Sequence, residues 1–530
     1  MANMNFLDRC IAAVSPERGV RRAAARTALD FYNSGYGNYG ANTEKKSMRG
    51  WMYWGGSPKE DIEDNISILR QRSRDAYMGV PIAAAALKTL RTNVIAGGLM
   101  PAPQIDGDFL HLSQDEVEAL QAQILREFAL WADGPGCDAD RIENFYELQQ
   151  LAFLSYLMNG DSFALLPVKE ATETQPYSLR VRLIEADRIC SPDLYDRLQP
   201  CDVRGYHVDS IVQGVETDAE GTVTAYWICS RHPLSSLAAQ SGELTWTRVE
   251  AYGQSGRQNI LHVMNRERAG QRRGVPILAP VLESLKQLGR YTEAEITAAV
   301  ISSMFTVFIK SATVQNGNPI GQMIPQQDLI DTQDENSIEM ASGAILSLNP
   351  GEEAQFADPK HPNSAYDTFF NAMAKEIAAA IEMPVEVLLK QFTQNFSSSR
   401  GALNEFWRVC GMKRDWFAAD FCQPIYNAWF AEAVARGRIS APGFFADPAI
   451  RKAYTLAKWN GPSRTALNPS QEVEAAIKRV NAGFSTAQDE AAQLTGTNYY
   501  KNIRARVIEA SRMREVNDII NPPQAQAAEK

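Results

Sequence analysis

Residues 277–304 read ILAPVLESLKQLGRYTEAEITAAVISSM, and this stretch decides the fold. Four apolar residues recur in it at spacings of three and four, the period of a helix with one apolar face: Leu278, Val281, Leu285 and Leu288. At 1.5 Å per residue the stretch would form a rod of about 40 Å, more typical of an assembly's spine than of a small domain. Because a lone long helix cannot bury such a stripe within its own chain, we expect these residues to pack against neighbouring subunits.

The sequence before this stretch predicts helices followed by strands. Helical periodicity covers residues 61–93, where Pro81 opens a second helix, and then residues 113–131 and 143–158. Ser113 and Glu116 form a capping-box pattern at the start of one helix. Between residues 160 and 265, short β-type runs alternate with Gly, Asp, Ser and Pro. This region predicts one mixed or antiparallel β domain.

The sequence after this stretch returns to helices. A polar insert is followed by a helix at 364–382, a polar loop at 385–400 and a long helix at 399–436 that is dense in aromatic residues. An aromatic stripe of this kind is more often core packing than a cofactor site. More helices follow residue 447. The predicted fold class is therefore α+β and mostly helical.

The composition excludes two classes of protein. The 530 residues include 53 Lys+Arg and 63 Asp+Glu, a formal net charge of −10. Tight duplex binding relies on clustered Lys and Arg, so the acidic balance argues against a protein that wraps nucleic acid for affinity. No run of 18 apolar residues occurs, so we expect no transmembrane helix and no membrane partner.

Motifs of enzymes are missing from the sequence. It contains no Gly-Lys dipeptide, so a Walker A loop cannot form, and it has no HExxH, GxSxG or CxxC. The five histidines have no nearby Cys or His partner in sequence, and the paired carboxylates are typical of solvated helix faces. We therefore expect no enzyme activity, no metal and no cofactor.

Seven fragments, in this order along residues 60–510, resemble segments of the lambda-like family of bacteriophage portal proteins. They are residues 274–278 (GVPIL), 375–388 (KEIAAAIEMPVEVL), 396–407 (FSSSRGALNEFW), 459–462 (WNGP), 468–472 (NPSQE), 482–486 (AGFST) and 496–499 (GTNY). The chain departs from the family pattern at Glu382-Met383, where Gly-Val is common. Asn468 and Gln471 replace the family's Asp and Lys, so a charge-pairing role there is in doubt.

The resemblance implies a portal-type architecture that assembles into a ring. Its parts would be a flexible N-terminal arm (1–59), wing (60–276), first stem helix (277–304), clip (305–358), second stem helix (359–384), tunnel loop (385–400), long wing helix (401–444), helical crown (445–515) and disordered tail (516–530).

The resemblance also implies a function. The chain would form a dodecameric ring at one capsid vertex of the virion, assembled in the host cytoplasm, and would serve as the channel for genome packaging and ejection. Its partners would be the terminase large subunit, then the head-tail adaptor, the major capsid and scaffold proteins, and the double-stranded DNA in the channel. Two alternatives stay open: another ring-forming minor capsid or adaptor protein, and an acidic cytosolic enzyme of unfamiliar type.

The tunnel loop would supply the contacts with DNA. A sliding duplex should not be held strongly, so we expect a largely acidic wall with a few basic and neutral contacts. The candidate residues are Lys390, Gln391, Thr393, Gln394, Asn395, Ser398 and Arg400. A structural alternative for Arg400 is that it caps the long helix or forms a salt bridge with it.

Overall fold

The structure is a computed structural model, and it describes only part of the chain. The described residues are 58–192, 211–235, 244–304, 307–309, 345–347, 365–392, 396–463 and 468–520, with parts of 10–57. The chain divides into two compact units, Met1–Ser57 and Pro58–Lys530. In the first unit, which covers most of the predicted N-terminal arm, a short helical turn spans Lys46–Met48. All further description concerns the second unit.

Helices expected before residue 160 are confirmed. After the short helix α3 (Pro58–Asp61) they are α4 (Ile66–Gly79), α5 (Pro81–Val94), α6 (Gly107–Leu110), α7 (Gln114–Ala132) and α8 (Phe145–Asn159). The predicted capping box is present, since the Glu116 N–H donates to the Ser113 hydroxyl and the Ser113 N–H donates to the Glu116 carboxylate. Asn144 and Glu147 form a second capping box at the start of α8. These caps fix where α7 and α8 begin.

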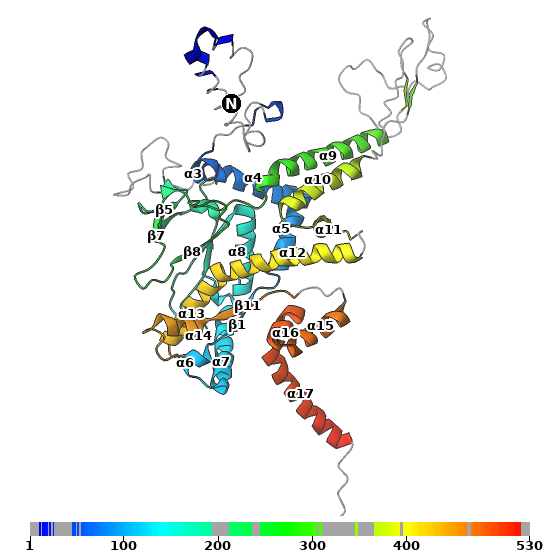
Figure 1. Cartoon of the computed structure of the whole chain (residues 1–530). Coiled ribbons are helices and arrows are strands. Elements are labelled where there is room, and N and C mark those ends of the chain that lie inside the picture. Colours follow the sequence, from blue (N-terminus) through cyan, green and yellow to red (C-terminus); the bar gives the residue numbers. More distant parts are fainter. Residues whose placement is uncertain are drawn as a thin grey trace, which may run out of the picture. The chain divides into compact units, whose positions relative to one another are not determined.

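Two small antiparallel sheets follow, as the sequence predicts. β2 (Asp161–Leu165) lies between β3 (Arg182–Ile184) and β8 (Ile260–Met264). The second sheet has the order β4-β5-β6-β7, with the bounds Ile211–Val212, Val215–Thr217, Val223–Cys229 and Trp246–Glu250. Side chains from both sheets, among them Phe163, Val215 and Tyr226, share one apolar cluster. The strands therefore form one β region, seen beside α8 in Figure 1.

The predicted stem consists of two helices that lie side by side (Figure 1). A 3-10 turn at Ala279–Val281 leads into α9 (Leu282–Met304), and α10 (Tyr366–Ala380) packs against α9. Of the predicted clip, the structure describes β9 (Val307–Ile309) and β10 (Ile345–Ser347), which pair in parallel. The remainder of 305–358 lies outside the described residues.

The expected role of the stem stripe is wrong. Leu278, Val281, Leu285 and Leu288 are 0–3 % exposed within the single chain. The reason is that α9 is not alone, since α4 and α10 of the same chain pack against it. These four residues therefore belong to the chain's own core and cannot serve as a contact between subunits.

The predicted tunnel loop is partly helical. Residues 385–400 begin with α11 (Val385–Leu389), where Val387 and Leu388 are buried, and end in the first turn of α12 (Phe396–Phe417). The long helix is confirmed but interrupted, because a π-helical turn at Ala418–Cys422 joins α12 to α13 (Gln423–Ala435). Its aromatic stripe is core, as expected: Phe406, Phe417, Phe421, Tyr426, Trp429 and Phe430 are all buried.

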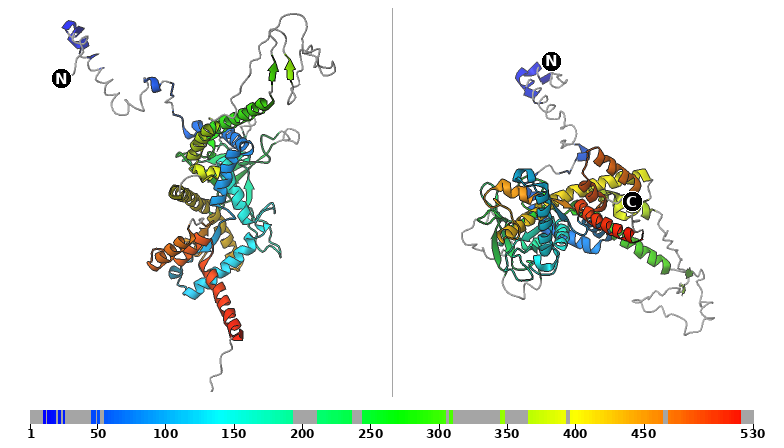
Figure 2. Two further views of the ribbon diagram at one scale, coloured as in Figure 1. Left: turned by 90° about the vertical axis from the view of Figure 1, so that its right-hand side faces the viewer. Right: turned by 90° about the horizontal axis from the view of Figure 1, so that it is seen from below.

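The first part of the predicted crown packs against the part predicted as wing. α14 (Pro448–Thr455) packs against α13, and β11 (Ala457–Asn460) pairs antiparallel with β1 (Met100–Pro103), so residues 448–460 pack with the part predicted as wing. α15 (Pro469–Asn481), α16 (Ala487–Thr495) and α17 (Tyr499–Ile520) follow (Figure 2). Helix α17 extends into the predicted disordered tail as far as residue 520. None of the helices in the described residues is long and apolar enough to cross a membrane.

Candidate channel segment and stem anchor

A fully buried arginine fixes the chain just before the predicted stem. The Arg273 side chain is 0 % exposed, and its Nε donates to the Asp161 carboxylate at 2.7 Å. Its Nη1 donates to the main-chain oxygens of Ile189 (2.8 Å) and Gln213 (2.6 Å), and its Nη2 to that of Ala186 (2.9 Å). A guanidinium with this many partners fixes the chain nine residues before α9 begins. We call Arg273 and Asp161, with the groups bonded to them, the stem anchor.

Asp161 is the anion of the stem anchor. It accepts hydrogen bonds from the Gly274 N–H at 2.6 Å and from His262 Nε2 at 3.0 Å, in addition to Arg273. Burial alone would raise the pKa of Asp161, but Arg273, His262 and Arg70 outweigh it and hold this pKa well below its usual range. Burial lowers the pKa of His262. At neutral pH a neutral His262 therefore donates from Nε2 to an ionised Asp161.

Two glycines allow the close approach that completes the stem anchor. A Cβ atom added to Gly274 would lie 1.9 Å from the Gly160 carbonyl oxygen, so only glycine fits. Gly160 itself has φ +83°, a conformation that favours glycine, where it ends α8. Gly274 belongs to the fragment GVPIL, in which the sequence resembled the portal family. Its physical role is to let the stem root touch the start of β2.

A neighbouring cluster has the composition of a metal site. Glu185, Asp187 and His232 each offer one ligand atom, all within 4.8 Å of one another. The guanidinium of Arg74 ion-pairs with both carboxylates, at 2.9 Å from Glu185 and in direct contact with Asp187. Arg74 already supplies the positive charge that the cluster needs, so these residues fit a salt-bridge network better than a metal site. Sequence spacing gave no sign of this cluster, because Arg74 lies more than 100 residues before its partners.

The expected channel residues lie around the junction of α11 and α12. Lys390 ends α11 in the left-handed conformation, with φ +55°, and both Lys390 and Gln391 are exposed. Ser398 and Arg400 are exposed on the first turn of α12. The other three, Thr393, Gln394 and Asn395, lie outside the described residues. The structure thus places four of the seven predicted residues at one junction.

The structural alternative for Arg400 gains no support from the residues that can be described. Among them, neither Arg400 nor Lys390 forms an ion pair with an acidic side chain. On the same helix, the Arg408 guanidinium ion-pairs instead with Glu405 at 3.2 Å.

Glu382, where the chain departs from the family pattern, has a backbone conformation that sequence reasoning did not predict. It has φ +57° after the last turn of α10, where the Glu382 N–H donates to Ala379 O and the Met383 N–H donates to Ala378 O. This pair of bonds is the Schellman motif, whose left-handed residue is usually glycine. The Glu382 carboxylate lies 3.0 Å from Lys413 Nζ on α12. The left-handed backbone explains why Gly is common here in the family pattern and why Glu is the departure.

Comparisons with known proteins agree with this architecture. The family model described as "Phage portal protein, lambda family" matches residues 44–414. The portal protein of Escherichia phage N15 is 21% identical over 516 residues, which cover 94% of this chain and 92% of that protein. Portal protein B of Escherichia phage lambda is 20% identical over 518 residues, with the same shares.

Solved structures from gene transfer agent particles were also found. A chain from the neck of the native particle, computed with C12 symmetry, has a TM-score of 0.40 and 13% identity, and the match covers 82% of this chain and 94% of that one. A chain from the virion of the native particle has a TM-score of 0.41 and 13% identity, with shares of 84% and 96%.

The family model decides between the alternatives that the sequence left open. It matches well over half of the chain, including the stem anchor, both stem helices and the start of α12. A minor capsid or adaptor protein and an unfamiliar acidic enzyme are thereby set aside. The chain belongs to the lambda family of phage portal proteins.

Proposed function

We propose that the chain assembles into a ring of twelve copies at one vertex of the capsid and forms the channel for packaging and ejecting the genome. The observation that carries this proposal is the family match over residues 44–414. The paired stem helices support it, since α9 alone extends for about 34 Å at 1.5 Å per residue. A long helix pair held at one end by the buried stem anchor suits the wall of a channel better than a catalytic site.

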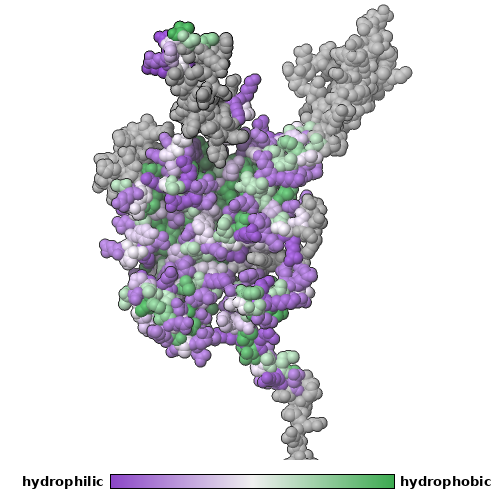
Figure 3. Space-filling view, viewed as in Figure 1, coloured by the Kyte–Doolittle hydropathy of each residue, from purple (hydrophilic) through white to green (hydrophobic). Residues whose placement is uncertain are grey.

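Neighbouring subunits would meet along the distal half of the stem. There the Ile296 side chain on α9 is 60 % exposed. Near the middle of α9, where Tyr291 contacts Phe369 of α10, the Phe369 side chain is 45 % exposed. Figure 3 shows apolar residues on the stem surface at this end. Since exposed apolar side chains gathered on one face mark a contact surface, we assign the subunit contact to this region. It replaces the buried stripe in that role.

The DNA would pass the α11–α12 junction. Lys390, Gln391, Ser398 and Arg400 are exposed there, and Thr393, Gln394 and Asn395 complete the proposed set. Twelve copies carry a formal charge of 12 × −10 = −120, which disfavours tight binding of phosphates. Two basic residues per copy would guide the duplex without holding it.

The partners follow from the same proposal. The terminase large subunit, and later the head-tail adaptor, would dock on the clip, while the major capsid and scaffold proteins would contact the ring in the capsid shell. Because the sequence has no Walker A loop, ATP hydrolysis would come from the terminase.

Packaging by rings of single variants tests the channel assignment. We expect Lys390→Ala and Arg400→Ala to alter the packaging rate or the retention of DNA in an in vitro assay. Arg408→Ala, an exposed arginine of the same helix that ion-pairs with Glu405, is the matched control and should package like the wild type. Unchanged packaging and retention in both variants would remove Lys390 and Arg400 from the channel.

A further inference from the structure

One edge of the two-stranded β1–β11 sheet is open. The Gln104 N–H donates to the Leu456 carbonyl at 2.7 Å, so Gln104 and Leu456 are a hydrogen-bonded pair of this antiparallel ladder. In an antiparallel ladder, residue pairs that exchange hydrogen bonds alternate with pairs that do not. Lys458 therefore bonds to β1, whereas the main-chain N–H and C=O groups of Ala457 and Trp459 point away from β1. Within the described residues, no main-chain hydrogen bond from beyond the β1–β11 pair reaches Ala457 or Trp459.

The opposite edge of the same sheet is closed. There the outward positions of β1 are Pro101 and Pro103, which have no N–H to offer. The Pro103 carbonyl accepts from the Gln121 side chain of α7 at 3.1 Å, which confirms that it points away from β11. Proline and a covering helix are two ways in which proteins block strand addition. The chain blocks one edge and leaves the other available.

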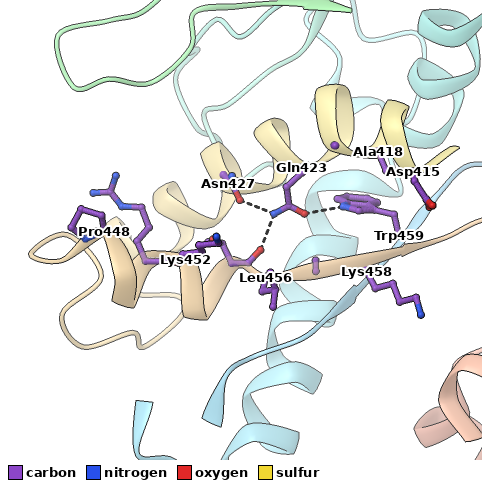
Figure 4. Close-up of a pocket in the computed structure, with 13 residues that line it drawn as sticks. Asp415, Ala418, Gln423, Asn427, Pro448, Lys452, Leu456, Lys458 and Trp459 are labelled. Atoms are coloured by element: carbon purple, nitrogen blue, oxygen red, sulfur yellow. Dashed lines mark hydrogen bonds between the residues drawn. The ribbon is translucent and has the colours of Figure 1, made fainter. Parts of the chain in front are cut away.

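A cavity of about 600 Å³ lies beside the open edge (Figure 4). It runs along the helix from Asp415 to Asn427, about 18 Å at 1.5 Å per residue, which is close to the length of five extended residues. Gln423 holds its walls together, because it accepts from Trp459 Nε1 at 2.9 Å and donates to Asn427 and to the Thr455 carbonyl at 2.8 Å. The cavity is thus a built feature of the α13–α14–β11 packing.

The charge of the cavity is opposite to that of the chain. Three cationic side chains line it, Arg451, Lys452 and Lys458, against one carboxylate, Asp415. Lys458 ion-pairs with Asp489 of α16, whereas Arg451 and Lys452 form no ion pair with a described residue. In a chain of net charge −10, the two cations that remain, Arg451 and Lys452, outnumber the one carboxylate and favour a ligand that carries carboxylates.

We propose that the open edge of β11 and this cavity bind an extended, acidic segment of a partner polypeptide. The segment would add as a strand beside β11, with main-chain bonds to Ala457 and Trp459, apolar side chains in the cavity and carboxylates near Arg451 and Lys452. Duplex DNA fits less well, because the cavity also presents alanine, leucine and tryptophan side chains beside a strand edge, which suit a peptide better than a row of phosphates. This inference does not depend on ring formation.

Fluorescence anisotropy with the full chain tests the proposal. The probe is a labelled eight-residue peptide of alternating glutamate and valine. We expect saturable binding with a dissociation constant below about 1 mM. Ala457→Pro removes an outward N–H and leaves the bonds to β1 intact, so binding should weaken at least ten-fold with an unchanged melting temperature. Lys452→Glu should weaken it several-fold, whereas Lys286→Glu, an exposed lysine of α9, should not.

Three outcomes would overturn the proposal. They are no binding of the acidic peptide, equal binding of a matched lysine–valine peptide, and unchanged affinity in both Ala457→Pro and Lys452→Glu. Tighter binding of a 20-base-pair duplex that Lys452→Glu weakens would assign the cavity to DNA instead. A failure here leaves the portal function intact, since ring formation is measured separately.

Discussion

The two halves of helix α9 have the same helical period but different surroundings. In the proximal half, Leu285 and Leu288 are 0 and 3 % exposed, covered by α4 and α10 of the same chain. In the distal half, Ile296 is 60 % exposed. An apolar stripe shows that a helix face is covered, but the covering element must be found from the fold. The proximal half belongs to the chain's own core, and the distal half is the surface that we propose for the contact with a neighbouring subunit.

The largest effect is expected from a charge in the proximal half. Leu285→Asp would bury an unpaired carboxylate, at a cost of about 5 kcal/mol or more in the free energy of unfolding. We expect no folded chain, as judged by circular dichroism and soluble yield. Leu285→Met, which conserves volume, should lose less than about 1.5 kcal/mol. A Leu285→Asp chain that folds normally but forms no ring would restore the stripe as a subunit contact.

Next in size is the stem anchor. Asp161→Asn would leave the buried Arg273 without its anion, and we expect the free energy of unfolding at pH 7 to fall by about 3–5 kcal/mol. Urea unfolding at pH 7 measures this loss. A loss below about 1 kcal/mol would mean that the carboxylate charge contributes little.

The pH dependence of the anchor has a definite sign. The pKa of Asp161 is lower in the folded chain than in the unfolded one, so its stabilisation is complete above about pH 4, the ordinary carboxyl value. It should be lost as the pH falls below that value toward the folded pKa. The melting temperature of Asp161→Asn should therefore depend less steeply on pH than that of the wild type in this window. If the melting temperatures of the wild type and of Asp161→Asn change equally with pH in this window, Asp161 is not the group responsible.

A charge in the distal half should spare the chain and break the assembly. For Ile296→Asp we expect a free energy of unfolding within about 0.5 kcal/mol of the wild-type monomer, because the side chain is exposed. Native mass spectrometry should then show monomers in place of rings. Glu293→Gln, an exposed change one turn earlier, is the control and should assemble. Intact Ile296→Asp rings would place the contact elsewhere.

The smallest effect is expected at the end of α10. Glu382→Gly relieves the strain of the left-handed backbone, which is stabilising. It also raises the conformational entropy of the unfolded chain and removes the ion pair with Lys413, and both of these effects are destabilising. Each contribution is about 1 kcal/mol or less, so the net change should lie within about 1 kcal/mol of zero. A double-mutant cycle with Lys413→Ala measures the ion pair alone. A coupling above about 2 kcal/mol would show that the pair holds α10 against α12 more strongly than an exposed pair should.

Local signals in the sequence predicted local structure well. The Ser113–Glu116 capping box, Pro81 at the start of α5 and the alternation between residues 160 and 265 each correspond to an element of the structure. The candidate channel residues could be placed near one junction only through the resemblance to the portal family. The spacing of exposed residues such as Lys390 and Arg400 does not by itself indicate the DNA contact that we propose for them.

Features that depend on distant parts of the chain were not predictable. One of the two helices that cover the Leu278–Leu288 stripe is α4, some 200 residues earlier. Strand β11 pairs with a strand more than 350 residues before it. The π-helical turn at Ala418–Cys422 has no residue pattern that marks it. The left-handed backbone of Glu382 was not predicted because glutamate gives no sign of this conformation, which the Schellman motif at the end of α10 imposes.

The most direct test of the central claim is an averaged electron-microscope image of the purified full chain. The proposed function predicts a ring of twelve copies around a central hole, lost in Ile296→Asp while Leu285→Met retains it. A monodisperse wild-type monomer under the same conditions would contradict the claim.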